Sequence, residues 1–299
     1  MAVVMLAVLT KNRTNPAYVG ARLGADRIAA RFGYQTAHFV PHHPDDVEEQ
    51  IALVDQALAQ QPAALVLAPA HETRLAPAAA RVQAAGIPLI TIVSSVVGVE
   101  PLCTIGSDDG ALAEAVTETL VQHLGRRGTL AIVNGHPDAQ TSRLRTVGFK
   151  AALARHPSMT LAAECRGDYQ RERAFRAFRT VLSDHAVIDG VVAANDYMAF
   201  GVLDALKEAG REAVVVGANA TPEGIALIKQ GRLLATAAFD AMSMSALAVE
   251  AVARHLKGEA VPGRIVLPAE IVIAGSIGHW DQPYDDRESI GWQEACRGC

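Results

Sequence analysis

The stretch VVMLAVLTKNRTNPAYVG, residues 3–20, decides the fold class. It begins with an unbroken apolar run over residues 3–9, continues through polar residues from Lys11 onward and then reaches Pro16. An apolar run without alternation is typical of a strand that is covered on both faces, as in a parallel sheet. Proline is favoured in the first turn of a helix. The stretch therefore predicts a buried strand whose carboxyl end is followed by the N-terminus of a helix.

The same pattern recurs along the chain. Further unbroken apolar runs, which we expect to be strands, cover residues 64–67, 88–93, 130–133, 190–193 and 214–217. Segments with apolar residues at helical spacing cover residues 18–31, 47–59, 111–124, 171–182 and 197–208. Repeated strand–helix units imply right-handed crossovers and parallel sheets. We therefore predict an α/β fold.

The composition supports this class and argues against others. Of the 299 residues, 50% are hydrophobic and 20% are charged, which excludes a disordered protein and allows two lobes of roughly 150 residues each. The formal net charge is −5. Nucleic acids and anionic membranes attract basic surfaces, so we expect neither as a partner. No apolar run approaches the ~20 residues of a membrane span.

The two ends of the chain bear on its location and organisation. The N-terminal apolar run has no basic region ahead of it, so we expect either a cytoplasmic protein or the mature form of an exported one. A seam between two lobes is expected near Ser107, where the strand–helix pattern begins again. From Ser276 the chain turns polar and carries both Trp280 and Trp292, so we expect a surface or disordered extension there.

Motifs of the common catalytic and metal sites are absent from the sequence. It has no glycine-rich phosphate loop, no Gly-x-Ser-x-Gly and no His-Glu-x-x-His. Residues 42–46 include two histidines and two aspartates, but flanking prolines and a following helix start favour a solvated loop. Cys296 and Cys299 have the spacing of a zinc pair without a second pair, and we favour a frayed tail. We therefore expect no metal and no cofactor.

A set of polar and aromatic side chains follows the ends of the predicted strands. Its members are Lys11, Asn15, Tyr18, Ser94, His136, Arg145, Asn195, Asn219, Phe239 and Asp240. Taken singly, an Asn or Asp at such a position is typical of a helix cap. Taken together, the set is compatible with one ligand cleft, because ligands of open α/β sheets bind beside the carboxyl ends of the strands.

Several segments occur in the order seen in ribose-type periplasmic sugar-binding proteins. They are residues 14–18 with Gly20 and Gly24, 85–90, 106–109, 142–149, 194–199 and 215–224. The resemblance covers residues 3–273 and implies the type I periplasmic-binding fold, in which two Rossmann-like lobes close like a hinge on a small sugar. It implies three crossings, near Ser107, Phe239 and Ala269. The implied lobes are residues 1–107 with 240–268 and residues 108–239 with 269–275, followed by a polar extension over residues 276–299.

The resemblance also implies which residues contact the ligand. Asn15 and Tyr18 are implied from the first lobe, and Arg145, Tyr169, Asn195 and Asn219 from the second. Lys11, Ser94, His136, Phe239 and Asp240 are further candidates. Arginine and asparagine hydrogen-bond to hydroxyl groups, and aromatic rings cover the apolar face of a sugar. Arg143 is not favoured, because the family motif keeps the arginine that lies three residues before Gly148.

The chain departs from the ribose-type pattern at four positions. Ser94 and Asn219 stand where ribose binders have carboxylates, Phe239 replaces a glutamine and Ala17 replaces an aromatic residue. The loss of two carboxylates argues against ribose itself. A polyol, a deoxy sugar and an acidic sugar paired with Lys11 stay open as ligands.

The resemblance implies a non-enzymatic protein that captures a small carbohydrate or polyol between its lobes and delivers it to the membrane permease of an ABC importer. It implies a periplasmic monomer that binds no nucleic acid and whose mature form lacks the signal peptide. One alternative is the ligand-sensing domain of a receptor or of a truncated repressor, since a repressor needs a helix-turn-helix ahead of the first strand. The other is a sugar-modifying α/β enzyme with His136 or Asp240 as acid or base.

Overall fold

The computed structural model describes residues 4–297, which divide into two compact units. Unit 1 comprises the chain up to Ser107, Asp240–Leu267 and the residues from Glu288 onward. Unit 2 comprises Asp108–Phe239 and Pro268–Arg287. The chain thus passes from one unit to the other after Ser107, Phe239, Leu267 and Arg287.

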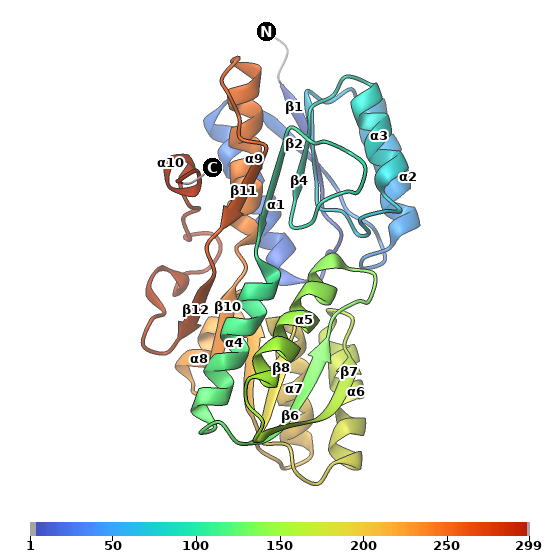
Figure 1. Ribbon diagram of the computed structural model, residues 1–299. Coiled ribbons are helices and arrows are strands. Elements are labelled where there is room, and N and C mark those ends of the chain that lie inside the picture. The colour runs from blue at the N-terminus through green and yellow to red at the C-terminus, as the bar shows by residue number, and fades with distance from the viewer. Residues whose placement is uncertain (1–3, 298–299) are drawn as a thin grey trace. The chain divides into compact units, whose positions relative to one another are not determined.

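Unit 1 is built on a six-stranded sheet in which every pairing is parallel. In sheet order its strands are β11 (Arg264–Leu267), β5 (Cys103–Ser107), β4 (Leu89–Ile92), β3 (Ala64–Leu67), β1 (Met5–Leu9) and β2 (Gln35–Phe39). Its helices are α1 (Pro16–Arg31), α2 (Val47–Ala59), α3 (Ala76–Ala84), α9 (Ala241–Leu256) and the short α10 (Trp292–Ala295). Helices α2 and α3 cover one face of the sheet and α1 and α9 the other (Figure 1).

Helices α1 and α9 approach each other closely because Gly24 carries no side chain. A Cβ atom at Gly24 would lie 2.3 Å from the carbonyl oxygen of Met242 on α9. On the other face, Leu9, Leu65 and Leu67 of the strands pack in one core cluster with Val54 of α2 and other residues of α2 and α3. Each such fully buried side chain contributes about 1.5–3 kcal/mol relative to an exposed one.

Unit 2 is built on a second six-stranded sheet, in which only β12 runs antiparallel to its neighbour. In sheet order its strands are β12 (Glu270–Ile273), β10 (Ala235–Ala238), β9 (Val214–Ala218), β8 (Gly190–Ala193), β6 (Gly128–Asn134) and β7 (Met159–Arg166). Its helices are α4 (Asp109–His123), α5 (Gln140–Ala154), α6 (Arg171–Asp184), α7 (Asp196–Glu208), α8 (Pro222–Lys229) and the single 3-10 turn η1 (Gly278–Trp280).

The predicted α/β class is confirmed. All residues of β3, β4 and β8 are buried, as expected for strands that helices cover on both faces. Six strands, β2, β5, β7, β10, β11 and β12, are not among the apolar runs that predicted strands. Four of them, β2, β7, β11 and β12, lie at sheet edges and are partly exposed, whereas β5 and β10 are internal.

The polar C-terminal segment is more ordered than expected. Trp280 is 4% exposed and Arg287 is 2% exposed, so both side chains are part of the interior of unit 2. Farther along, Trp292 of α10 lies against Arg254 of α9, with 4.7 Å between the guanidinium carbon and the ring centroid. Cys299 lies outside the described residues.

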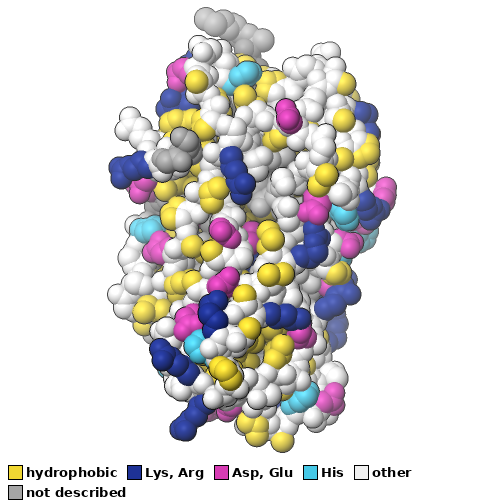
Figure 2. All heavy atoms as spheres, viewed as in Figure 1, with side chains coloured by type: hydrophobic (Ala, Val, Ile, Leu, Met, Phe, Trp, Pro, Cys, Tyr) yellow, Lys and Arg dark blue, Asp and Glu magenta, His cyan; other side chains and the backbone are white. Residues whose placement is uncertain are grey.

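Two properties of the described chain bear on its surroundings. Among residues 4–297, every helix is too short or too polar to cross a lipid bilayer. On the face shown in Figure 2, Lys and Arg side chains are interspersed with Asp and Glu side chains rather than gathered in one basic area.

Candidate functional site

In unit 1, the loop after β1 is held in place by its own side chains. The Asn12 Oδ1 atom accepts hydrogen bonds from the backbone nitrogens of Thr14 and Asn15, both at 2.8 Å. Asn15 caps α1, because its Oδ1 accepts from the Ala17 nitrogen at 3.1 Å, and a proline follows in the first turn as predicted. The loop therefore presents its polar side chains in a fixed geometry beside the carboxyl end of β1.

Lys11 lies at the start of this loop and Tyr18 lies just after it, in α1. Both side chains are buried, with exposures of 2% and 6%. The Lys11 Nζ atom donates to the Pro69 carbonyl oxygen, which follows β3, at 3.5 Å. A buried ammonium group is stable only with polar or anionic groups around it. The role of Lys11 as a ligand contact stays a prediction.

The loop after β4 contains a strained residue followed by a polar one. Val93 has a φ of 71°, and the Ser94 nitrogen donates to the Ile92 carbonyl at 2.7 Å, which closes a three-residue turn around Val93. A β-branched residue in this region of backbone space is an outlier. Ser94 is 4% exposed, and its Oγ atom has no hydrogen-bond partner among the described residues.

In unit 2, Arg145 of α5 lies at the centre of a buried group of side chains. Its Nε atom donates to Asp109 Oδ1 at 2.7 Å, and its Nη1 atom donates to the Ala194 carbonyl at 2.6 Å. The guanidinium carbon lies 4.7 Å from the centroid of the Phe239 ring. Arg143 is exposed instead and donates to the carbonyl of Pro137 at 3.2 Å.

Asp109 was not among the predicted site residues. Its side chain is 2% exposed, and its carboxylate balances the charge of Arg145 within the low-polarity interior. In the sequence Asp109 stands beside Asp108, which caps α4 by accepting from the Ala111 nitrogen at 2.9 Å. The cap explains why an acidic pair occurs here, but only the fold shows which of the two meets the arginine.

Asn195 and Asn219 follow the neighbouring strands β8 and β9, and each has a buried polar atom without a partner among the described residues. Asn195 caps α7 through its Oδ1, which accepts from the Met198 nitrogen at 2.9 Å, while its Nδ2 is unpaired. Asn219 has a φ of 116°, and its unpaired atom is Oδ1. A buried polar atom left unpaired costs about 1–3 kcal/mol, so these positions suit hydrogen bonds to a bound solute.

Tyr169 and His136 occupy the loops after β7 and β6. Tyr169 has a φ of 61°, and its hydroxyl shares a hydrogen bond of 2.8 Å with Thr141 Oγ1. Its ring lies over Gly135, where a Cβ atom would be 2.3 Å from the ring. His136 is half-buried, and its Nδ1 accepts from the Asp138 nitrogen at 3.3 Å.

Phe239 and Asp240 are neighbours in the sequence but belong to different units. Phe239 supports Arg145 in unit 2. Asp240 caps α9 in unit 1, where its Oδ1 accepts from the Ser243 nitrogen at 3.0 Å and its Oδ2 from the Ser243 hydroxyl. The Asp240 carboxylate thus already carries out a structural role.

Asp196 is a second residue that the sequence patterns did not reveal. It is fully buried next to Asn195, and it accepts hydrogen bonds from Thr236 Oγ1 at 2.6 Å and from the Thr221 nitrogen at 2.9 Å. Desolvation raises the pKa of Asp196 to about 6 in spite of these hydrogen bonds. The residue ties α7 to the loop that carries Asn219.

Near residues 42–46, His43, Asp46 and Glu49 place their ligand atoms within 4.8 Å of one another. These atoms are engaged locally. Asp46 Oδ1 caps α2 by accepting from the Glu49 nitrogen at 2.9 Å, and Glu49 is hydrogen-bonded to His43. The hydrogen bond with Glu49 also raises the pKa of His43.

Comparison with known proteins shows which chains this one is similar to. A family model described as "Periplasmic binding protein domain" matches residues 6–260. The ribose import binding protein of Escherichia coli K12 is 27% identical over 274 residues, which are 91% of this chain and 92% of that protein. A xylitol-binding protein of Mycolicibacterium smegmatis is 29% identical over 194 residues, which are 64% of this chain and 56% of that protein.

Among solved structures, the chain resembles an ABC transporter solute-binding protein of Actinobacillus succinogenes with bound D-allose. The TM-score is 0.87 at 24% sequence identity, and the match covers 91% of this chain and 98% of the other. At this identity the likeness supports the fold, and it agrees with the two mainly parallel sheets of the chain.

Proposed function

Because the chain belongs to the periplasmic binding protein family, we propose that it captures a small carbohydrate or polyol and delivers it to the membrane permease of an ABC importer. Its relatives include a ribose import binding protein and a xylitol-binding protein. The family name supports a periplasmic location. We propose units 1 and 2 as the two lobes of the predicted fold, each of which supplies part of the solute's hydrogen bonds.

One observation carries this proposal. The unpaired Nδ2 of Asn195 and the unpaired Oδ1 of Asn219 lie at the carboxyl ends of neighbouring parallel strands. The first atom can only donate a hydrogen bond and the second can only accept one. A hydroxyl group does both, so a compound with several hydroxyl groups satisfies the two asparagines together.

The charges of unit 2 favour a neutral solute. The buried carboxylate of Asp109 compensates the Arg145 guanidinium at 2.7 Å, so this pair contributes no net charge. Phe239 beside Arg145 supplies an aromatic face for the C–H side of a sugar ring. An acidic sugar would need Lys11 of unit 1 as its partner.

We also propose that the protein binds without catalysis, as a monomer and without nucleic acid. Asp240 caps a helix and His136 accepts a hydrogen bond from its own loop, so the two candidate acid–base groups are committed to local structure. The net charge of −5 and the mixed charges on the face in Figure 2 do not favour a polyanion.

The first test is a thermal-shift screen of pentoses, hexoses, polyols and sugar acids, followed by calorimetry on every hit. A solute at 100 times its dissociation constant stabilises a protein by ~2.7 kcal/mol. We expect a neutral sugar or polyol to be the best hit and to be recovered chemically unchanged. The proposal would be refuted if none of these compounds shifted the melting temperature, or if the solute were chemically converted. A preference for sugar acids would indicate that Lys11 pairs with the carboxylate of the ligand.

The variant Asn219→Gly tests the site itself. Glycine tolerates the φ of 116° at this position and removes the unpaired oxygen, so we expect at least a tenfold loss of affinity with little change in stability. Arg155→Ala, which removes an exposed pair with Glu114, is the control and should leave the affinity unchanged. Equal affinities of Asn219→Gly and the unmodified protein would place the site elsewhere.

A further inference from the structure

The C-terminal segment of unit 2 reaches the loop that carries Asn219. This segment, residues 276–287, contains the buried Arg287, whose Nη1 donates to the Ala220 carbonyl at 2.9 Å. Ala220 directly follows Asn219, whose Oδ1 is one of the unpaired buried polar atoms of the proposed site. An arginine 67 residues further along the chain thus contacts the backbone that places a candidate ligand residue.

The contacted backbone is strained. Asn219 has a φ of 116° and Ala220 a φ of 45°, and neither is glycine. Non-glycine residues are rarely found in such regions, and they persist there only when their surroundings hold them. The position of the Asn219 side chain therefore depends on the groups that fix this loop.

Strand β10 and the first residue of α7 fix the loop through three of its backbone nitrogens. Asn219 donates to the Ala237 carbonyl at 2.8 Å, Ala220 donates to Thr236 Oγ1 at 3.1 Å, and Thr221 donates to Asp196 Oδ2 at 2.9 Å. The Ala220 carbonyl is held by Arg287 instead. The strained segment is thus held through its nitrogens by β10 and α7, and through the Ala220 oxygen by the C-terminal segment.

Arg287 is itself held rigidly. Its Nη2 donates to the Trp280 carbonyl at 2.8 Å and to the Gln282 carbonyl at 3.2 Å. The guanidinium carbon lies 5.0 Å from the Trp280 ring centroid and 5.1 Å from that of Tyr284. A planar guanidinium fixed in this way connects several carbonyl groups at once, which the single ammonium group of a lysine does less well.

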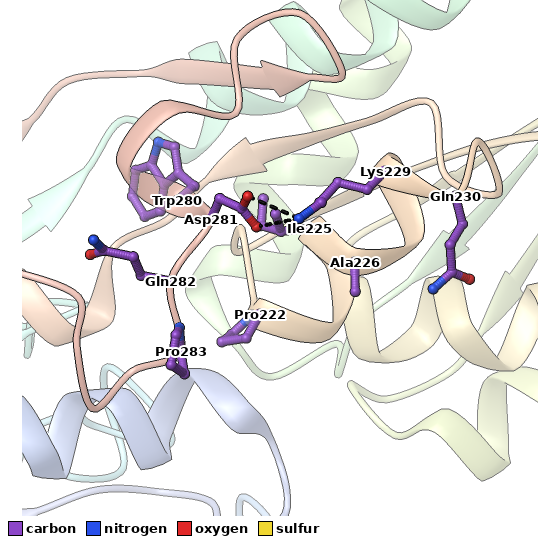
Figure 3. Close-up of a pocket in the computed structure, with 9 residues that line it drawn as sticks. All are labelled: Pro222, Ile225, Ala226, Lys229, Gln230, Trp280, Asp281, Gln282 and Pro283. Carbon is purple, nitrogen blue, oxygen red and sulfur yellow. Dashed lines mark hydrogen bonds and ion pairs between the residues drawn. The ribbon is translucent and has the colours of Figure 1, made fainter.

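The segment is also attached to α8, the helix that follows Asn219. Figure 3 shows Trp280 and Asp281 opposite Pro222, Ile225 and Lys229, around a pocket of about 430 Å³. Lys229 Nζ lies 3.0 and 2.9 Å from the two carboxylate oxygens of Asp281. Both partners of this pair are about half exposed, so the pair adds little compared with the buried arginine.

From these contacts we infer that Arg287 is a positioning residue for the solute site, which holds the Asn219–Ala220 backbone so that Asn219 meets the ligand. This inference rests on the proposed function. It assigns to the polar C-terminal segment a role in affinity that does not require it to touch the solute.

The main test compares solute affinities by calorimetry, with the best compound of the screen. Arg287→Ala removes the hydrogen bond to Ala220, and we expect at least a tenfold loss of affinity, since hydrogen bonds from charged groups are stronger than those between neutral groups. Arg287→Lys should recover part of the loss. Lys229→Ala, which breaks only the exposed pair of the same segment, should leave the affinity unchanged.

A double-mutant cycle separates positioning from general destabilisation. If Arg287 acts through Asn219, the variant carrying both Arg287→Ala and Asn219→Gly binds no more weakly than Asn219→Gly alone. If the two substitutions lower the solute affinity independently, so that their effects add in the double variant, the inference is overturned. An unchanged affinity of Arg287→Ala would overturn it as well, and should this variant not fold, Arg287→Gln serves in the same cycle.

A measurement without solute distinguishes failure of this inference from failure of the proposed function. We expect Arg287→Ala, but not Lys229→Ala, to accelerate hydrogen exchange of a peptide spanning residues 219–224. If the unmodified protein binds none of the compounds, the proposed function fails while exchange still tests the loop. Equal exchange in Arg287→Ala and the unmodified protein would refute the positioning role.

Discussion

Asp196, the first residue of α7, holds the Asn219 loop through a buried carboxyl group. It accepts hydrogen bonds from Thr236 and from both the nitrogen and the hydroxyl of Thr221. Removal from water disfavours the carboxylate, and this desolvation raises the pKa of Asp196 from 3.8 to about 6. A group with a raised pKa makes the stability of the folded protein depend on pH.

The sign of this dependence follows from the two pKa values. Between about pH 4 and pH 6 the folded state binds the Asp196 proton more tightly than the unfolded state does. The proton therefore adds to the free energy of unfolding at the lower pH, and this contribution is lost as the pH rises through 6. We expect Asp196→Asn to lack this part of the slope. Chemical denaturation at pH 4.5, 5.5 and 6.5 checks this, and identical slopes in both proteins would contradict it.

At the scale of elements, each unit depends on helices packed closely over a sheet. Helices α1 and α9 form such a pair in unit 1, at Gly24 and Met242. Both helices of the pair are capped locally at their N-termini, α1 by Asn15 and α9 by Asp240. The helices are therefore fixed at the ends that follow the strands, and the close approach at Gly24 sets their separation.

Filling the space at Gly24 should push these helices apart. In Gly24→Ala the new Cβ atom would lie 2.3 Å from a backbone oxygen, which cannot rotate away, so we expect a destabilisation of roughly 1–3 kcal/mol despite the better helix propensity of alanine. Val19→Ala, at an exposed site of the same helix, should change stability little. Urea denaturation measures both, and a Gly24→Ala protein of unchanged stability would show that the helices adjust.

The predicted apolar runs include most of the central strands, though not β5 and β10, and none of the edge strands. Strands β1, β3 and β8 read as apolar runs because helices cover both of their faces, whereas β2 and β7 each have a neighbour on one side only and remain partly exposed. An exposed edge needs no apolar run. The α/β class was therefore predictable from the central strands, while the number of strands in each sheet was not.

At the scale of the whole molecule, each unit has one tryptophan: Trp280 in unit 2 and Trp292 in unit 1. The variants Trp292→Phe and Trp280→Phe thus leave one fluorescent reporter for each unit. We expect Gly24→Ala to lower the unfolding midpoint reported by Trp292 more than that reported by Trp280, since Gly24 belongs to unit 1. Equal shifts would instead show that the two units unfold as one cooperative body.

The roles of Asp109, Asp196 and Arg287 show what the sequence did not reveal. Their partners lie 36, 40 and 67 residues away along the chain, for Arg145, Thr236 and Ala220 respectively. No local pattern marks such pairs. The ligand-contact roles of Lys11, Asn15, Tyr18, Tyr169 and the other residues that follow the strands stay predictions, which measurements of solute affinity test.

The sequence by itself determined the α/β class, the position of polar residues after strand ends and the family, because strand burial and helix capping are local properties that leave local patterns. Only the tertiary structure decided which polar atoms remain unpaired, that Asp109 balances Arg145, and that the polar C-terminal segment enters unit 2 through Arg287. These features arise where segments distant in sequence meet. Hydrogen bonds and ion pairs form within a few ångströms, and only folding brings such groups that close.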